Sequence, residues 1–254
     1  MNPHDTPHTA HPPDSPFEIA RERLIVALDV PTAEAALALA ERLEDQCQWF
    51  KVGLELYIAA GPAIVEKLVS RGHSIFLDLK LHDIPNTVAA AVRSAASLGA
   101  NLLTVHASGG LAMLAAAQEA VSLMATPPQL LAVTVLTSMD ATQLSAVGIE
   151  RLAALQVLRL AETAAQSGIN GLVASAQEAA ELRKRFPAAT LVIPGIRPAG
   201  SEIGDQKRTA TPAAALAAGA SYLVVGRPIT QAHDPVAATQ AILDEMHTAS
   251  PATP

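Results

Sequence analysis

Short apolar runs alternate along the chain with longer stretches in which apolar residues recur at helical spacing. The apolar runs cover residues 24–28, 49–52, 74–79, 101–105, 130–136, 171–175, 190–194 and 222–226. Each run predicts a strand, because strands that are buried on both faces read as continuous apolar segments. The stretches between them predict helices over residues 33–44, 57–70, 87–98, 109–123, 150–167, 176–185, 211–218 and 235–247.

Eight strand–helix alternations predict an α/β fold, a (β/α)8 TIM barrel in a single domain. A doubly wound open sheet is the alternative, but such sheets usually carry a glycine-rich turn after the first strand. Here the first strand ends in ALDVPT, which contains no glycine. We see no linker, so we expect the barrel to span residues 17–254. Residues 1–16 are rich in proline and histidine, and we expect a disordered tail there.

The composition of the 254 residues disfavours nucleic acid and membrane as partners of the protein. A net charge of −7 disfavours a nucleic-acid partner, which would need a basic face. No apolar run approaches the roughly 18 to 20 residues that a membrane span needs, so we expect no membrane partner. The single cysteine, Cys47, and an N-terminal segment that does not read as a signal peptide favour a reducing, cytoplasmic location.

Polar residues follow the apolar runs at the ends that a barrel turns toward its active site. They are Asp29, Lys51, Asp78, Lys80, Asp83 in the loop beyond, His106, Thr137, Ser138, Arg197, Gly226 and Arg227. Because the carboxyl ends of the strands meet at one mouth, we expect these residues to converge there. We expect His106 to order neighbouring backbone and to have no catalytic role.

Asp78 and Lys80 are two residues apart, so an extended backbone would point both side chains to one side, where Lys51 could reach them. With Asp83 they would form an alternating array of two ammonium and two carboxylate groups. The array could be a solvated charge cluster. Four charges at the ends of two adjacent strands of an apolar fold instead favour a functional role.

The array indicates chemistry that forms a carbanion. An ammonium between carboxylates is expected to stay protonated, which disfavours Lys80 as a Schiff-base nucleophile. It favours Lys80 as a proton donor and as a fixed positive charge beside a developing carbanion. Asp78, facing an anionic group of the substrate, would repel that group until it departs. Loss of carbon dioxide fits this arrangement.

Two glycine-containing segments lie around the last two strands. Residues 194–208, PGIRPAGSEIGDQKR, are too long for a plain connection and predict a mobile lid over the substrate. In VVGRPIT, Gly226 allows close approach of the backbone and Arg227 can bind a phosphate with two hydrogen bonds. Since barrels often bind phosphate after strands 7 and 8, we predict a phosphate site there. An ordinary surface turn is the alternative.

From Leu24 to His233 the sequence resembles the orotidine 5′-phosphate decarboxylase family. The resemblance rests on ALDV, FKVGLELY, FLDLKLHDIPNTV, VTVLTS, PGIRPAGSEIGDQKR and VVGRPIT. The D-x-K-x-x-D core would be shared with related sugar-phosphate decarboxylases and aldol-type synthases. HDIPNT, the glutamine-containing lid segment and GRPIT are far more specific.

The resemblance implies decarboxylation of orotidine 5′-phosphate to uridine 5′-monophosphate, the last step of pyrimidine nucleotide synthesis, with no metal and no organic cofactor. It implies that Lys80 protonates C6 of the pyrimidine and that Asp78 lies against the departing carboxylate. Lys51 and Asp83 would complete the charge network. Two alternatives stay open: a metal-dependent 3-keto-sugar-phosphate decarboxylase or synthase, and a catalytically silent phosphate-binding protein.

The resemblance also implies the substrate contacts and a homodimer. Asp83 and Thr87 would reach into the site of the neighbouring subunit, so that the two subunits share their sites. The implied substrate-binding residues are Asp29 and Lys51 at the ribose, Thr137 at the pyrimidine amide edge, Arg197 and Gln206 in the lid, Gly226 and Arg227 at the phosphate, and Asp83, Ile84, Thr87 and Pro194.

Overall fold

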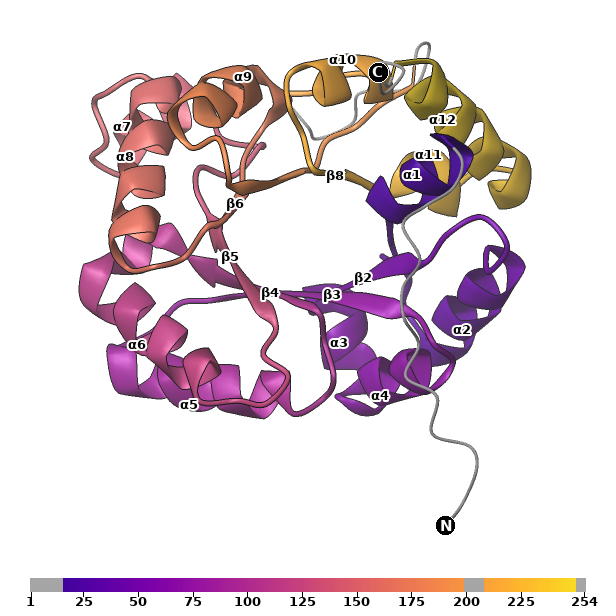
Figure 1. The fold of residues 1–254 in the computed structure, drawn as a ribbon, viewed down its shortest axis with the longest axis horizontal. Helices are drawn as coiled ribbons and strands as arrows, with labels where there is room; N and C mark the ends of the chain where they lie inside the picture. The colour runs from indigo at the N-terminus through magenta and orange to yellow at the C-terminus, as the bar shows by residue number, and fades with distance from the viewer. Residues whose placement is uncertain (1–15, 199–207, 250–254) are drawn as a thin grey trace.

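The chain folds into a closed barrel of eight parallel strands, surrounded by a ring of helices (Figure 1). This architecture is seen in a computed structural model that describes residues 16–198 and 208–249. The strands follow one another around the barrel in chain order, and β1 closes it by pairing in parallel with β8. The prediction of a (β/α)8 barrel is therefore confirmed.

The strands are short and the helices are more numerous than the sequence pattern predicts. The strands are β1 (Leu24–Ala27), β2 (Trp49–Gly53), β3 (Ser74–Leu81), β4 (Leu102–His106), β5 (Gln129–Val133), β6 (Gly171–Val173), β7 (Thr190–Ile193) and β8 (Tyr222–Val225). The helices are α1 (Pro16–Arg23), α2 (Ala33–Arg42), α3 (Leu54–Ala60), α4 (Ala63–Ser70), α5 (Pro85–Ala96), the 3₁₀ turn η1 (Ala107–Gly109), α6 (Gly110–Ser122), α7 (Ala141–Ala146), α8 (Ala153–Gln166), α9 (Ala176–Arg185), α10 (Pro212–Ala217), α11 (Arg227–Thr230) and α12 (Pro235–Ala249).

One predicted helix is wrong in its length. The helix expected over residues 57–70 is two helices, α3 and α4, because the chain turns between them at Gly61 and Pro62. Gly61 has a φ of 68°, a left-handed conformation that favours glycine. Helix α3 begins directly after β2, so that its first residues stand beside the mouth of the barrel.

Three short helices were not predicted: α1, α7 and α11. In α7 a local signal was available, because Asp140 Oδ1 accepts a hydrogen bond from the backbone N–H of Gln143, and Gln143 Oε1 accepts one from the backbone N–H of Asp140. Pro16, placed by the sequence pattern in the tail, is the first residue of α1. The rest of the predicted tail lies outside the described residues.

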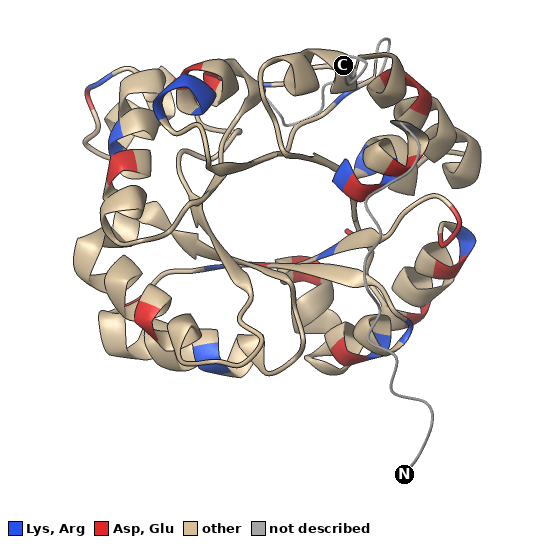
Figure 2. Cartoon of the chain, in the orientation of Figure 1, with Lys and Arg blue, Asp and Glu red and all other residues tan. Residues whose placement is uncertain are grey.

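The core has two layers that explain the continuous apolar runs. Within β1, Ile25 and Ala27 belong to the cluster inside the barrel, whereas Leu24 and Val26 pack outward against the helices. Because successive side chains of a strand point to opposite faces, a strand with apolar surroundings on both sides needs an unbroken apolar run. Charged residues are therefore found mainly on the outer helices (Figure 2). None of the helices described is long and apolar enough to span a membrane.

Candidate active site

A cavity of about 500 Å³ opens at the carboxyl ends of the strands. It brings together most of the residues that the strand ends predicted, and with them Pro194, which the family resemblance implied. These are Asp29, Lys51, Asp78, Lys80, Thr137, Ser138, Pro194, Arg197, Gly226 and Arg227. They come from segments up to about two hundred positions apart in the sequence, and the barrel places them around one space.

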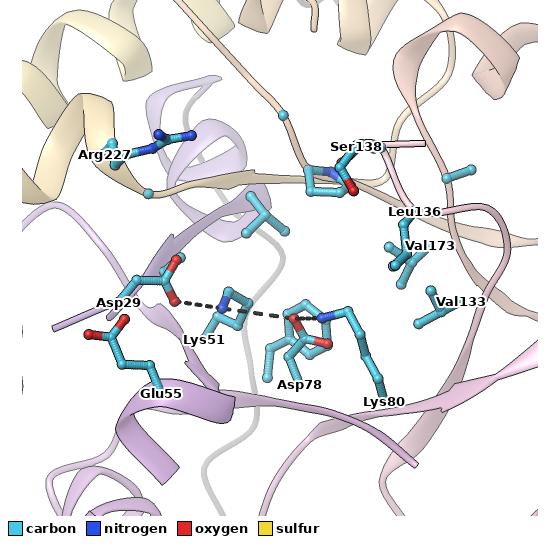
Figure 3. A pocket seen from close by; sticks show the side chains of 18 of the residues that line it. Asp29, Lys51, Glu55, Asp78, Lys80, Val133, Leu136, Ser138, Val173 and Arg227 are labelled. Carbon is cyan, nitrogen blue, oxygen red and sulfur yellow. Dashed lines mark hydrogen bonds and ion pairs between the residues drawn. The ribbon is translucent and has the colours of Figure 1, made fainter. Parts of the chain in front are cut away.

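Four charged side chains form a continuous row in this cavity (Figure 3). The Nζ atom of Lys51 lies 2.9 Å from Asp29 Oδ1 and 3.8 Å from Asp78 Oδ2. The Nζ atom of Lys80 lies 2.8 Å from the same Oδ2 of Asp78. The row therefore alternates in sign, from Asp29 through Lys51 and Asp78 to Lys80.

The middle of the row is buried. Lys51 is 9% exposed and Asp78 is 8% exposed. Removing an isolated charge from water is very unfavourable, and proteins bury charges that are paired. Here each buried charge has two partners of opposite sign, so the row holds its members in fixed positions inside an otherwise apolar barrel.

Lys80 reaches the row through an irregular backbone. The side chains of Asp78 and Lys80 meet as predicted within β3, but the backbone at Lys80 is not extended as the prediction assumed. Lys80 has a φ of 50°, and it is the one non-glycine residue with positive φ in the part of the chain that the structure describes. The pairing of β3 with β4 shifts register between Leu77 and Leu81. This bulge re-aims Lys80 so that it reaches the oxygen of Asp78 that also faces Lys51.

Thr104 of β4 supports this bulge and was not among the predicted site residues. Its side chain is fully buried. The hydroxyl donates to Asp78 Oδ1 at 3.0 Å and accepts the backbone N–H of Lys80 at 2.8 Å. The signal available in the sequence was a hydroxyl inside the apolar run NLLTV.

Not every predicted site residue lines the cavity of the single chain. Asp83, Ile84 and Thr87 are exposed and lie outside it. Asp83 Oδ1 instead accepts the backbone N–H of Ile84 at 2.6 Å. Within the single chain, the fourth member of the row of charges is therefore Asp29. Gln206 and the centre of the predicted lid fall on residues 199–207, outside the described part of the chain.

Several cavity residues were not predicted. Glu55 follows β2 in the first turn of α3, and Gln231 follows α11. The others are mostly inward-facing apolar residues of the strands and their ends: Ala27, Phe76, Val133, Val135, Leu136, Val173, Ala174 and Val224. Strand alternation could have indicated some of them. They give one part of the cavity an apolar wall.

Arg227 and Gly226 lie at the start of α11, directly after β8. Figure 3 shows Arg227 on the Asp29 side of the cavity, away from Lys80. A guanidinium in that place can bind an anion through paired hydrogen bonds. The cavity thus has a cationic group far from the Asp78–Lys80 pair.

His106 stands at the end of β4 without lining the cavity. Its ring stacks on His82, with ring centroids 5.4 Å apart, and the Ser108 hydroxyl lies 3.2 Å from its Nδ1. Burial lowers the pKa of His106, and the neighbouring His82 and Lys80 lower it further. Within the described residues, no group of three or more His, Cys, Asp or Glu side chains is arranged to hold a metal ion.

The barrel and its row of alternating charges define the chain as an enzyme of the (β/α)8 class with a polar active site at the carboxyl ends of its strands. A family model described as "Orotidine 5'-phosphate decarboxylase / HUMPS family" matches residues 22–242. The chain belongs to this family, and within it is a decarboxylase of the lyase type.

Relatives and a solved structure support this assignment. A protein of Idiomarina loihiensis named orotidine 5′-phosphate decarboxylase is 53% identical, covering 89% of this chain and 98% of the relative. One of Halorhodospira halophila with the same name is 54% identical, covering 88% and 95%. The crystal structure of orotidine 5′-phosphate decarboxylase from Lactobacillus acidophilus superposes with a TM-score of 0.77 at 40% identity, covering 88% of this chain and 98% of that one.

Proposed function

We propose that this enzyme converts orotidine 5′-phosphate to uridine 5′-monophosphate and carbon dioxide, the last step of de novo pyrimidine nucleotide synthesis. The observation that carries the proposal is the buried row of alternating charges at the barrel mouth. The names of its relatives support this choice of substrate. Neither metal nor organic cofactor takes part in the proposed reaction.

The proposed reaction uses the Asp78–Lys80 end of the row. The bond between C6 of the pyrimidine and the carboxylate breaks, carbon dioxide departs, and the electron pair stays on C6. The ammonium of Lys80 stabilises this carbanion and gives it a proton, after which the neutral amine regains a proton from solvent. Asp78 faces the substrate carboxylate, so that its repulsion is relieved as carbon dioxide leaves.

The rest of the cavity binds the nucleotide and so positions its pyrimidine beside Asp78 and Lys80. Arg227 and Gly226 bind the phosphate, and Asp29 and Lys51 bind the ribose hydroxyls. The positions of Arg227 and Lys80 on opposite sides of the cavity in Figure 3 support this division. Binding energy gained far from C6 can then hold the carboxylate against Asp78.

The remaining predicted contacts surround the base. Thr137 reads the pyrimidine amide edge, and Pro194 and Arg197 contact the nucleotide after β7. The position of all three in the cavity lining supports these roles. Gln206 stays a prediction from the family pattern.

We further propose a homodimer in which Asp83, Ile84 and Thr87 complete the neighbouring site. Exposed apolar side chains support it, because they follow the carboxyl ends of three adjacent strands. Leu54 follows β2 and is 50% exposed, Ile84 follows β3 and is 67% exposed, and Leu111 follows β4 and is 48% exposed. Apolar groups gathered in this way mark a protein contact. A cytoplasmic location agrees with the free, buried thiol of Cys47.

An absorbance assay tests the proposed function. Purified protein is incubated with orotidine 5′-phosphate, and the loss of orotate absorbance is followed before and after treatment with EDTA. We expect equal turnover in both samples, with uridine 5′-monophosphate as product. Activity that EDTA abolishes, with turnover of a 3-keto-sugar phosphate, would favour the metal-dependent relatives. Nucleotide binding without turnover would favour a silent binding protein.

A further inference from the structure

Thr104 occupies the place of a missing backbone acceptor. Leu77 of β3 pairs with Leu103, and Leu81 pairs with Val105, so that Asp78, Leu79 and Lys80 stand opposite Thr104 alone. A regular ladder would satisfy the N–H of Lys80 with a carbonyl of the neighbouring strand. Here the Thr104 hydroxyl accepts that N–H at 2.8 Å.

The same hydroxyl completes the hydrogen bonding of Asp78. Its Oδ2 faces the two ammonium groups, at 2.8 Å from Lys80 and 3.8 Å from Lys51. Its Oδ1 accepts the proton of Thr104 at 3.0 Å. The carboxylate is therefore held on both oxygens and has little freedom to rotate.

We infer that Thr104 is a positioning residue for the decarboxylation, through a hydroxyl that fixes both the Asp78 carboxylate and the left-handed backbone of Lys80. This inference rests on the proposed function for its kinetic part. Thr104 itself is fully buried behind Asp78 and does not line the cavity, so it acts through its two partners.

The two roles depend on different properties of the hydroxyl. As a donor it orients Asp78, and as an acceptor it replaces the ladder bond that the bulge removes. Valine has nearly the same shape without the hydroxyl, whereas serine keeps the hydroxyl and loses only the methyl group. Comparing these two substitutions separates hydrogen bonding from packing.

The matched control is Thr134, a second buried threonine close to the barrel mouth. Its hydroxyl donates to the carbonyl of Val173 at 2.8 Å and has no bond to the row of charges. Replacing it with valine removes a buried hydroxyl of the same kind from an adjacent strand end. A loss caused by general destabilisation would appear in both valine variants.

The experiment measures kcat, KM and product affinity in wild type and in Thr104→Val, Thr104→Ser and Thr134→Val. A misplacement of reacting groups by about 1 Å costs on the order of 100-fold in rate. We therefore expect kcat of Thr104→Val to fall by about that factor, while the Kd for uridine 5′-monophosphate, set mainly by the phosphate and ribose contacts, stays within about threefold. Thr104→Ser and Thr134→Val should stay close to wild type.

A crystal structure of Thr104→Val provides a readout that does not depend on turnover. We expect the Asp78 carboxylate to rotate, or Lys80 to leave its φ of 50°. Unchanged geometry in that structure, an unchanged kcat, or a Thr104→Ser variant as slow as Thr104→Val would each overturn the inference. A wild-type protein that fails to decarboxylate would overturn the proposed function instead, and the crystal structure would still decide whether Thr104 positions the pair.

Discussion

Lys80 combines an unfavourable backbone conformation with the end position in a row of charges. A left-handed conformation is costly for residues other than glycine, and it persists where the surrounding structure holds it in place. Here the hydroxyl of Thr104 and the carboxylate of Asp78 both bind Lys80. Strain of this kind is common at functional sites, which agrees with the chemistry that we propose for this residue.

Replacing Lys80 with alanine tests the proposed proton donor. Without the ammonium the carbanion has neither a proton source nor its nearest positive charge, so kcat should fall by at least about 1,000-fold. Binding of uridine 5′-monophosphate, measured by calorimetry, should persist because the phosphate group remains bound. A variant that kept more than about a tenth of wild-type kcat would refute the role.

Replacing Arg227 with alanine tests the proposed phosphate site, on the other side of the cavity from Lys80. Removing a guanidinium that binds a phosphate takes away an interaction present in substrate, transition state and product alike. KM for the substrate and Kd for the product should therefore rise together by about 100-fold, with a smaller change in kcat. Steady-state kinetics and calorimetry on one preparation provide both values. A loss confined to kcat would contradict a phosphate-binding role.

At the scale of elements, a buried ion pair joins three parts of the barrel. Arg208 Nη1 lies 2.5 Å from Oε1 of Glu178, a residue of α9. Arg208 and Glu178 are each 6% exposed. The Nη2 atom of Arg208 donates to the carbonyls of Val135 at 3.0 Å and Leu136 at 3.1 Å, directly before Thr137. The Ser175 hydroxyl donates to the other carboxylate oxygen. The pair thus fixes the segment after β5 that lines the cavity.

Replacing one partner of this ion pair should destabilise the fold more than replacing both partners with apolar residues. Arg208→Met leaves the Glu178 charge buried without its partner, and we expect a loss of about 3 to 5 kcal/mol in the free energy of unfolding. The double variant Glu178→Leu with Arg208→Met should recover much of that loss, because no unpaired charge stays buried. Urea denaturation followed by circular dichroism measures both values. Equal losses in the single and double variants would show that the pair itself stabilises the barrel.

The helices and strands also show which features of the fold and of the site could be predicted from the sequence and which could not. The barrel and most of the polar cavity residues followed from apolar runs and from the polar residue after each run, since burial on both faces and strand polarity are local patterns. The bulge at Lys80 was not predictable in this way. It depends on the pairing of β3 with β4, and therefore on Thr104, which lies 24 positions further along the chain. The break at Gly61 and Pro62 had a local signal, because a Gly–Pro pair marks a turn, but the helical spacing of apolar residues on both sides of the pair masked it.

At the scale of the whole molecule, the proposed dimer can be tested at Ile84. This side chain is 67% exposed beside Asp83, and an aspartate in its place would put a charge into the proposed interface. Ile84→Asp should shift the protein to monomer in sedimentation velocity, with a parallel loss of turnover because the sites would be shared. Leu123→Asp is the matched control, since Leu123 is 83% exposed at the end of α6, where the chain approaches the opposite end of the barrel. Equal effects of the two variants would reject this interface.

The free energy of unfolding should decrease at acid pH, in part because of the titration of His106. Its pKa in the folded protein is lowered, chiefly by burial and further by His82 and Lys80, and Asp78 offsets this in part. As the pH falls below about 6.5, the unfolded chain gains a proton at this residue before the folded protein does, so folding becomes less favourable. Above that pH the His106 side chain is neutral in both the folded and the unfolded protein, so it no longer lowers the free energy of unfolding.

Thermal melting between about pH 5.5 and 7.5 measures this effect. His106→Asn should lose less in Tm over this interval than wild type, because its side chain does not titrate. His233→Asn, at an exposed position, should follow the wild-type curve. A His106→Asn curve parallel to that of wild type would contradict the assignment.

The pairing of β1 with β8 has a consequence for synthesis on the ribosome. The first strand, Leu24–Ala27, keeps an unpaired edge until Tyr222–Val225 has left the exit tunnel. For most of translation the nascent chain therefore exposes a hydrogen-bonding edge beside apolar surface, which is the combination that chaperones recognise and that aggregates at high concentration. A chain truncated before residue 222 should consequently be captured by chaperones or be insoluble, even though it contains seven of the eight strands.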